Sequence, residues 1–250
     1  MSGHSKWKTI QHKKGAADAK RGKVFSKLSK ELMVAARKGS DPSANPTLRA
    51  VIQKAKSANM PSDNVTRAIK KGAGELEGVI FEEISYEGFI NGVALIVQGL
   101  TDNKNRAAAE IRHIFTRHGT DFAVSGSVMR QFVRKGQIIV DAATVEEDKL
   151  MEIVLNAGAE DMVKEGDEYN ITTDPASFAD VSEAVEKAGI KPISAEVSLI
   201  PLAPAKIAEK AKAEKVLRFV ADLEDSDDVQ NVYTNMDIDD AVLKELEKSA

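Results

Sequence analysis

The chain contains no cysteine among its 250 residues. Disulfide bonds, thiolate zinc sites and cysteine nucleophiles are therefore excluded, and the composition fits a reducing compartment. Aromatic residues make up only 5% of the chain, with a single tryptophan, which leaves little material for stacking against bases. No apolar run approaches the roughly 18 residues that span a bilayer, and the N-terminus lacks the apolar core of a signal peptide. These absences predict a cytoplasmic protein.

Charge is abundant in this chain, and it is unevenly divided. Residues 1–71 hold 17 Lys and Arg against 4 Asp and Glu, a net charge of +13. The remaining residues hold 18 against 35, a net charge of −17. An asymmetry of this size favours a polyanionic partner for the basic part, most often nucleic acid.

The spacing of apolar and basic residues in 1–74 predicts a small helical domain with a basic tail. From Ala16 to Lys38 apolar residues recur at helical spacing, and the lysines fall on the opposite side of the helix. Pro46 suits the first position of a second amphipathic helix, and Gly72 ends a short third helix. The domain thus offers an apolar face to its own core and a positive face to a partner.

The rest of the chain alternates between predicted strands and helices. We expect helices from "TDNKN" to His118, from a capping box of Thr144 and Glu147 to Gly158, from Asp174 and Pro175 to Gly189, and from about Lys206 to Leu223. Strands are expected at residues 93–100, 127–133, 137–141, 160–166, 168–174, 195–201 and 229–235. Residues 136–201 then follow the order strand, helix, strand, strand, helix, strand, which is ferredoxin-like.

The predicted fold class is α+β, with a helical N-terminal domain followed by two ferredoxin-like α/β domains, the third inserted into the second. The expected divisions are a basic helical domain at 1–74, an α/β domain at 78–134 plus 203–240, an inserted α/β domain at 135–202 and a C-terminal tail at 241–250.

The basic N-terminal segment is the leading candidate site. Its lysines are spaced to neutralise successive phosphates, and they are Lys6, Lys8, Lys13, Lys14, Lys20, Lys23, Lys27 and Lys30. Trp7 lies between two of them, where it could stack on a base. The alternative is a solvated helix face and tail that dock onto the chain's own acidic half. The excess of basic residues favours nucleic acid.

Two further segments are weaker candidates. The second and third predicted helices flank a short turn and resemble a helix-turn-helix, with Asn64, Arg67 and Lys71 on the exposed side of the later helix. Lys70 lies with Arg67 near the negative end of that helix. The segment "TDNKNR" places Asn103, Lys104, Asn105 and Arg106 at a strand-to-helix junction, where free backbone amides can hold an anion. Helix capping alone explains Asp102 or Asn103, and we favour that interpretation.

The sequence contains no complete motif for a catalytic or metal site. Glu110 and His113 make one ExxH pair, whereas a di-iron site needs two such pairs and further carboxylates. His4 and His12 have no third ligand at a metal-binding spacing. We therefore expect no enzyme activity, no metal and no cofactor.

Several long motifs resemble the YebC/PmpR family, which includes the mitochondrial translational activator of cytochrome oxidase. They are "GHSKWKTIQHKKGAADAKRGKVFSKL", "ANMPSDNVTRAIKKG", "FEEISYEGF", "LTDNKNRAAAEIRHIF" and "GSV". The resemblance covers nearly the whole chain and implies three domains, a helical one and two α/β ones, without catalysis. It also carries the family's basic motif onto Lys6, Trp7, His12, Lys13, Lys14, Lys20 and Arg21.

The resemblance leaves two functions open. Bacterial members are labelled probable transcriptional regulators that bind DNA, whereas other members act in translation on RNA or the ribosome. We expect the first, a DNA-binding regulator, with the RNA- or ribosome-binding factor as the alternative. Either reading implies a nucleic-acid partner and no membrane, and leaves the acidic α/β domains free to bind a protein.

Overall fold

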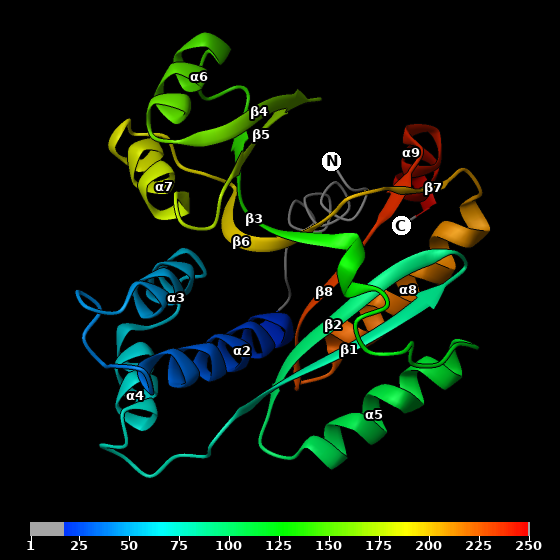
Figure 1. Cartoon of the computed structure of the whole chain (residues 1–250), viewed down its shortest axis with the longest axis horizontal. Helices are drawn as coiled ribbons and strands as arrows, with labels where there is room; N and C mark the ends of the chain where they lie inside the picture. Colours follow the sequence, from blue (N-terminus) through cyan, green and yellow to red (C-terminus); the bar gives the residue numbers. More distant parts are fainter. Residues whose placement is uncertain (1–17, 250) are drawn as a thin grey trace.

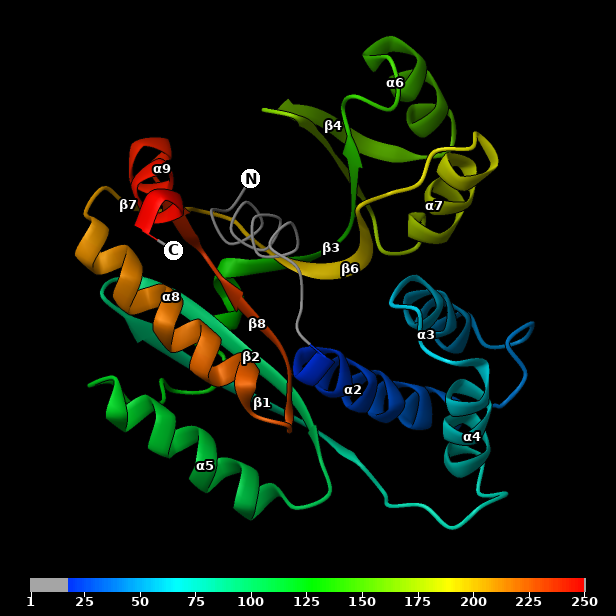
Figure 2. The same ribbon diagram turned by 180° about the vertical axis from the view of Figure 1, so that it is seen from behind.

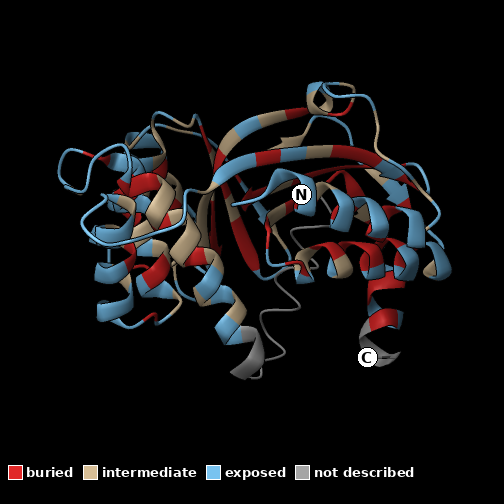
Figure 3. Cartoon of the chain, turned by 90° about the horizontal axis from the view of Figure 1, so that it is seen from below, coloured by how far each residue is buried: buried red, intermediate tan, exposed pale blue. Residues whose placement is uncertain are grey.

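The computed structural model describes residues 18–249, with side chains from residue 21 to residue 246 (Figure 1). The described residues form an α+β fold in which a helical region precedes two mixed regions built on antiparallel sheets. Each region has a hydrophobic core of its own. Exposed and buried positions alternate along the helices that face the viewer in Figure 3, so these helices turn one side inward. None of the helices in the described range has the length and apolar character needed to cross a membrane.

The N-terminal region consists of α2 (Asp18–Ala36), α3 (Pro46–Ser57) and α4 (Ser62–Gly72). The apolar stripe of α2 packs against both later helices around Leu32 and Leu48. Asn45 joins α2 to α3, because its side-chain oxygen caps α3 and its amide nitrogen donates to the carbonyl oxygens of Ala35 in α2 and of Gly39 in the loop that follows. Gly72 lets α4 cross close to α2, since a Cβ there would overlap the backbone of Met33.

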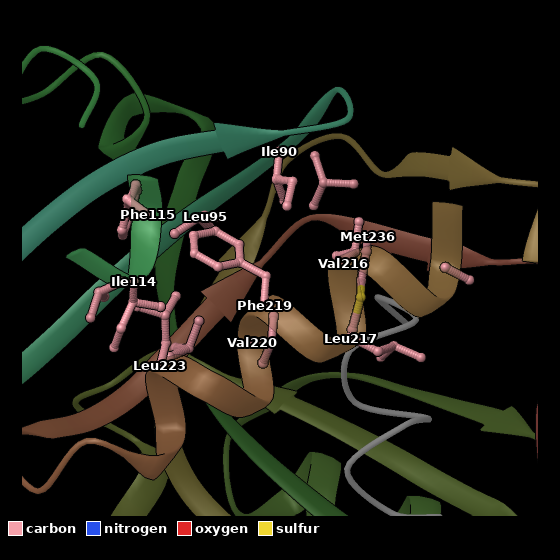
Figure 4. Packing of buried hydrophobic residues seen from close by; sticks show 14 of the residues in the cluster. Ile90, Leu95, Ile114, Phe115, Val216, Leu217, Phe219, Val220, Leu223 and Met236 are labelled. Carbon is pink, nitrogen blue, oxygen red and sulfur yellow. The ribbon is translucent and has the colours of Figure 1, made fainter. Parts of the chain in front are cut away.

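The second region is a three-stranded sheet in the order β1 (Glu82–Ile90), β2 (Val93–Thr101), β8 (Val229–Thr234). One face is covered by α5 (Lys104–Arg117) and α8 (Lys210–Asp225), and Phe115, Phe219 and Leu95 meet between them (Figure 4). Val128 and Phe132 cover the opposite face. Because both faces are covered, β2 is buried along almost its whole length.

The third region is inserted between β2 and β8 and contains β3 (Phe132–Asp141), α6 (Glu147–Asn156), β4 (Ala159–Glu165), β5 (Glu168–Thr173), α7 (Phe178–Lys187) and β6 (Ser194–Pro201). Its sheet has the order β4-β5-β3-β6, with every neighbouring pair antiparallel. This arrangement confirms the predicted ferredoxin-like order. In both opposite views the inserted region lies above the N-terminal helices and the second region lies beside them (Figure 1, Figure 2).

Several predicted element boundaries are wrong. The two strands expected at 127–133 and 137–141 are one strand, β3, preceded by a 3-10 turn at Met129–Gln131. The predicted capping box is absent, because the Thr144 hydroxyl donates to the carbonyl oxygen of Asp141 instead of capping α6. α7 begins at Phe178 rather than near Asp174.

The C-terminal part also differs from the sequence prediction. β7 (Ala205–Ile207) occupies the start of the helix expected from Lys206, and α8 begins four residues later. β7 pairs in parallel with β9 (Met236–Ile238). The expected tail is helix α9 (Asp240–Ser249), whose buried Val242, Leu243 and Leu246 belong to the core of the second region. These three apolar residues at helical spacing are the signal that could have predicted α9.

Candidate nucleic-acid interface

The predicted site residues fall partly within the described structure. Six of them lie outside the described residues, namely Lys6, Trp7, Lys8, His12, Lys13 and Lys14. The side chain of Lys20 is outside the described part as well. The others fall on two helices: Arg21, Lys23, Lys27 and Lys30 on α2, and Arg67, Lys70 and Lys71 on α4. These two helices place their basic side chains in different environments.

Three lysines of α2 contact the chain's own acidic residues. This lysine stripe consists of Lys23, Lys27 and Lys30, which share one helix face at spacings of four and three. Opposite it lies the acidic turn, residues 224–228, which connects α8 to β8 and carries four carboxylates in five residues. Lys23 Nζ lies 2.5 Å from a carboxylate oxygen of Asp225, and Lys27 Nζ donates to the carbonyl oxygen of Glu224 at 2.6 Å. The first turns of α2 approach this turn in both opposite views (Figure 1, Figure 2).

The inner end of the stripe belongs to a buried polar network. Lys30 Nζ donates to the carbonyl oxygen of Asp227 at 2.7 Å and to a carboxylate oxygen of Asp228 at 2.9 Å. The other Asp228 oxygen accepts from Arg106 at 2.9 Å and from the Thr101 hydroxyl at 3.0 Å. The side chains of Lys30 and Asp228 are only 14% and 5% exposed. This end of the contact is shielded from solvent ions.

The outer end is exposed. The side chains of Lys23 and Asp225 are 43% and 74% exposed, so water and salt weaken their attraction. The hydrogen bond to Asp225 raises the pKa of the Lys23 ammonium above its ordinary value. Burial lowers the pKa of the Lys27 ammonium, against the opposing effect of the nearby acids. Solvent and salt therefore screen the ion pair at Lys23, whereas the ion pair at Lys30 is protected from them by burial.

Asp228 is fixed on both its backbone and its side chain. Its carbonyl oxygen accepts from the backbone N–H of Leu100 at 2.8 Å, and this approach is possible because Gly99 has no Cβ to block it. Burial raises the pKa of the Asp228 carboxyl, but the hydrogen bonds from its three donors lower it by more than burial raises it. The pKa of Asp228 therefore lies below the ordinary aspartate value. The last residue of the acidic turn is thus anchored by both its backbone and its side chain.

The basic residues of α4 have a different environment. Arg67, Lys70 and Lys71 are exposed and form no ion pair with another described residue. Lys71 and Arg37 line a hollow of about 320 Å³ together with the linker at residues 73–81. Lys38 and Lys56, at the ends of α2 and α3, are exposed as well. The helix ends of the N-terminal region therefore present positive charge to solvent.

The segment at residues 101–106 is occupied by internal contacts. Asn103 caps α5 by accepting from the backbone N–H of Arg106, which confirms the capping interpretation. Lys104 is paired with Glu82, and the Arg106 side chain is paired with both Asp102 and Asp228. Asn105 is exposed. The basic side chains of this segment thus already contact carboxylates of the chain.

The ExxH pair does not form part of a metal-binding cluster in the described structure. Glu110 accepts a hydrogen bond from the Ser226 hydroxyl at 2.6 Å, and His113 is exposed. Within residues 18–249, no group of three His, Asp or Glu side chains is arranged to hold a metal ion.

For Lys23, Lys27 and Lys30 the structure bears out the alternative expectation, a helix face docked onto the chain's own acidic half, although the sequence did not single out residues 224–228 as the partner. Their signal was present as "EDSDD" at residues 224–228, the densest run of acids in the chain. A run of like charge is usually a solvated surface, so its charge alone does not place it against the lysine stripe.

Comparison with known proteins decides the family. A model described as the TACO1/YebC protein N-terminal domain matches residues 5–75, and one described as the TACO1/YebC second and third domain matches residues 81–236. The chain belongs to the TACO1/YebC family. The two matches meet in the linker between α4 and β1, where the helical region ends in the structure.

Proteins of several bacteria are similar to this chain over nearly their full length. A probable transcriptional regulatory protein of Desulfatibacillum aliphaticivorans is 55% identical, covering 97% of this chain and 99% of that protein. One of Geobacter sulfurreducens is 52% identical, covering 98% of this chain and 100% of that protein. The crystal structure of a conserved hypothetical protein from Aquifex aeolicus is 45% identical, with a TM-score of 0.80 over 89% of this chain and 93% of that one.

Proposed function

We propose that this chain is a cytoplasmic regulatory protein that binds nucleic acid, and that it acts on DNA as a transcriptional regulator. The observation that carries the proposal is the exposed basic surface of α4, Arg67, Lys70 and Lys71, in a region whose net charge is strongly positive. Its relatives named as probable transcriptional regulatory proteins support the same function. The scarcity of aromatic residues favours duplex over single-stranded ligands, which are usually held by stacking.

Binding in this proposal depends mainly on phosphate contacts. The exposed cations of α4 and the basic N-terminal segment would neutralise backbone phosphates and release counterions, which makes affinity depend strongly on salt. Such contacts position a protein on the duplex without reading its sequence. For about six phosphates, log affinity should fall against log salt with a slope of about −4 to −5.

The test is a titration of mixed-sequence duplex DNA, and of RNA of the same length, at several salt concentrations. A triple variant, Arg67→Glu with Lys70→Glu and Lys71→Glu, should bind the duplex at least tenfold more weakly and reduce the salt slope by about 2 to 3. The matched control is Lys149→Glu with Lys191→Glu and Lys215→Glu, which makes the same charge change at exposed positions elsewhere.

Three outcomes are decisive. A flat salt response, or equal weakening by the two triple variants, would contradict the proposed interface. Tighter binding of RNA than of duplex, together with co-sedimentation with ribosomes that the α4 variant abolishes, would establish the translational alternative instead. Preference for one promoter over mixed duplex would establish a specific regulator.

A further inference from the structure

The acidic turn presents oxygen atoms to the lysine stripe in a regular series. Lys23, Lys27 and Lys30 contact it at successive turns of α2, so each ammonium meets a different part of residues 224–228. Both carboxylate and carbonyl oxygens take part, and the carbonyl oxygens of Glu224 and Asp225 belong to the last turn of α8. The last carbonyl groups of a helix are beyond the reach of its own N–H donors, and the helix dipole makes that end negative.

A nucleic-acid backbone offers the same kind of ligand, a row of negatively charged oxygen atoms. The carboxylates of Asp225 and Asp228, which lie 2.5 and 2.9 Å from Lys23 and Lys30, would repel a phosphate brought to the same ammonium groups. The acidic turn and a phosphate backbone would therefore be alternative ligands of one surface.

The junction between the N-terminal helices and the second region is polar. The hydrophobic core of the helices is built from residues of α2, α3 and α4 with Ala58 and Met60 of the turn between α3 and α4, and none of its members comes from the sheets. Lys23, Lys27 and Lys30 instead cross to the second region through hydrogen bonds. Domains joined by small polar interfaces usually move relative to each other. Opening these contacts would leave the core of the helical region intact.

We propose that the acidic turn is an internal competitor for nucleic acid: residues 224–228 cover the lysine stripe of α2 in the free protein, and nucleic acid displaces them. This inference rests on the proposed function and adds a regulation to it. Displacement begins at the exposed Lys23–Asp225 pair and proceeds toward the buried Lys30–Asp228 pair. The apparent affinity for nucleic acid then equals the intrinsic affinity multiplied by the fraction of molecules in which the stripe is uncovered.

The first test removes the competitor. In the variant Asp225→Lys with Asp227→Lys, the turn repels the stripe, and the full-length protein should bind mixed-sequence duplex DNA about three- to tenfold more tightly than a charge-matched control. The control, Asp148→Lys with Glu152→Lys, changes two exposed acids of α6 by the same charge. Circular dichroism and thermal unfolding establish that both variants fold.

Two results separate this inference from the proposed function. If the wild type binds DNA and the two variants tighten binding equally, the acidic turn is not a competitor and the proposed function stands. If neither the wild type nor either variant binds DNA or RNA, the proposed function is wrong and the inference falls with it.

A second test needs no change in the acidic turn. A carbodiimide joins an ammonium directly to a carboxylate in contact with it, so it should link Lys23 to Asp225 in the free wild-type protein. Saturating duplex DNA should reduce that crosslink several-fold, as measured by mass spectrometry of the peptides. The Lys187–Glu183 pair of α7, at 2.9 Å, is the internal control and should react equally with and without DNA.

The variant Lys23→Arg, which keeps the charge but removes the reactive amine, should abolish the Lys23 crosslink alone. An undiminished Lys23–Asp225 crosslink in protein that is fully bound to DNA would overturn the inference.

Discussion

At the scale of single residues, Glu87 is the clearest case of a charge placed for structure. Its side chain lies on β1, and its residue is only 6% exposed. The two carboxylate oxygens accept from the backbone N–H groups of Gly126, Val128 and Met129 at 2.6 to 2.9 Å. This one carboxylate therefore holds the loop that covers the outer face of the sheet.

We predict that Glu87→Gln lowers the free energy of unfolding by about 2 kcal/mol at neutral pH, because charged acceptors form the stronger hydrogen bonds. Burial raises the pKa of the Glu87 carboxyl, but the three N–H donors bring it below the ordinary value of 4.5. A lowered folded-state pKa means that this stabilisation is complete above the ordinary value and is lost as the pH falls through the folded-state pKa.

The measurement is urea unfolding of the wild type and Glu87→Gln from neutral to acidic pH. The difference between them should shrink once the pH drops below about 4.5. Glu152→Gln, at an exposed position of α6, should show little difference at any pH. A wild-type advantage that is independent of pH would show that the charge of Glu87 does not hold the loop.

At the scale of elements, α2 has two sides with separate tasks. Its apolar side packs on α3 and α4, while its lysine stripe caps the end of α8. Lysines at a helix C-terminus satisfy carbonyl groups and the negative end of the dipole, and here they come from another helix. The contact is therefore a helix cap made in tertiary structure.

We predict that the two ends of the stripe contribute unequally to stability. Lys30→Ala should lower the free energy of unfolding by about 2 kcal/mol, because Asp228 is buried and loses one of its charged donors. Lys23→Ala should cost no more than about 0.5 kcal/mol, because its pair with Asp225 is exposed. Chemical unfolding of the full chain measures both, and equal effects would contradict the graded contact.

At the scale of the whole molecule, the structure shows how the basic and acidic parts of the chain are placed relative to each other. The basic helical region lies against an acidic turn of the second region, so part of the opposite charge is neutralised within the molecule. The exposed cations of α4 are left outside this contact. Electrostatics between regions should then control the shape of the protein.

We predict that raising the salt concentration increases the radius of gyration measured by small-angle X-ray scattering, because screening weakens the exposed end of the contact. The variant Asp225→Lys with Asp227→Lys should be expanded already at low salt and respond less to added salt. The α6 control variant Asp148→Lys with Glu152→Lys should behave as the wild type. A radius that is the same in all three proteins at every salt concentration would show that the regions stay docked.

Much of the fold could be predicted because its signals are local. Pro46 begins α3, Asn103 caps α5, and the apolar spacing of α2 defines its buried side, all through interactions within a few residues. The errors fall where tertiary context overrides the local pattern. β7 is a strand because β9 lies beside it in parallel, and that partner is distant in sequence.

The candidate site was predicted in composition but not in arrangement. The sequence by itself determined the helical character of the N-terminal region, its excess of positive charge and the positions of its lysines on one face of α2, because spacing and charge are properties of the chain. Only the tertiary structure decided which of those lysines meet solvent. Lys23 and Asp225 are 202 residues apart, and they meet because β8 pairs with β2 and brings the acidic turn to the start of α2. A lysine attracts any acid within reach, so its partner is set by packing and not by its own sequence neighbourhood.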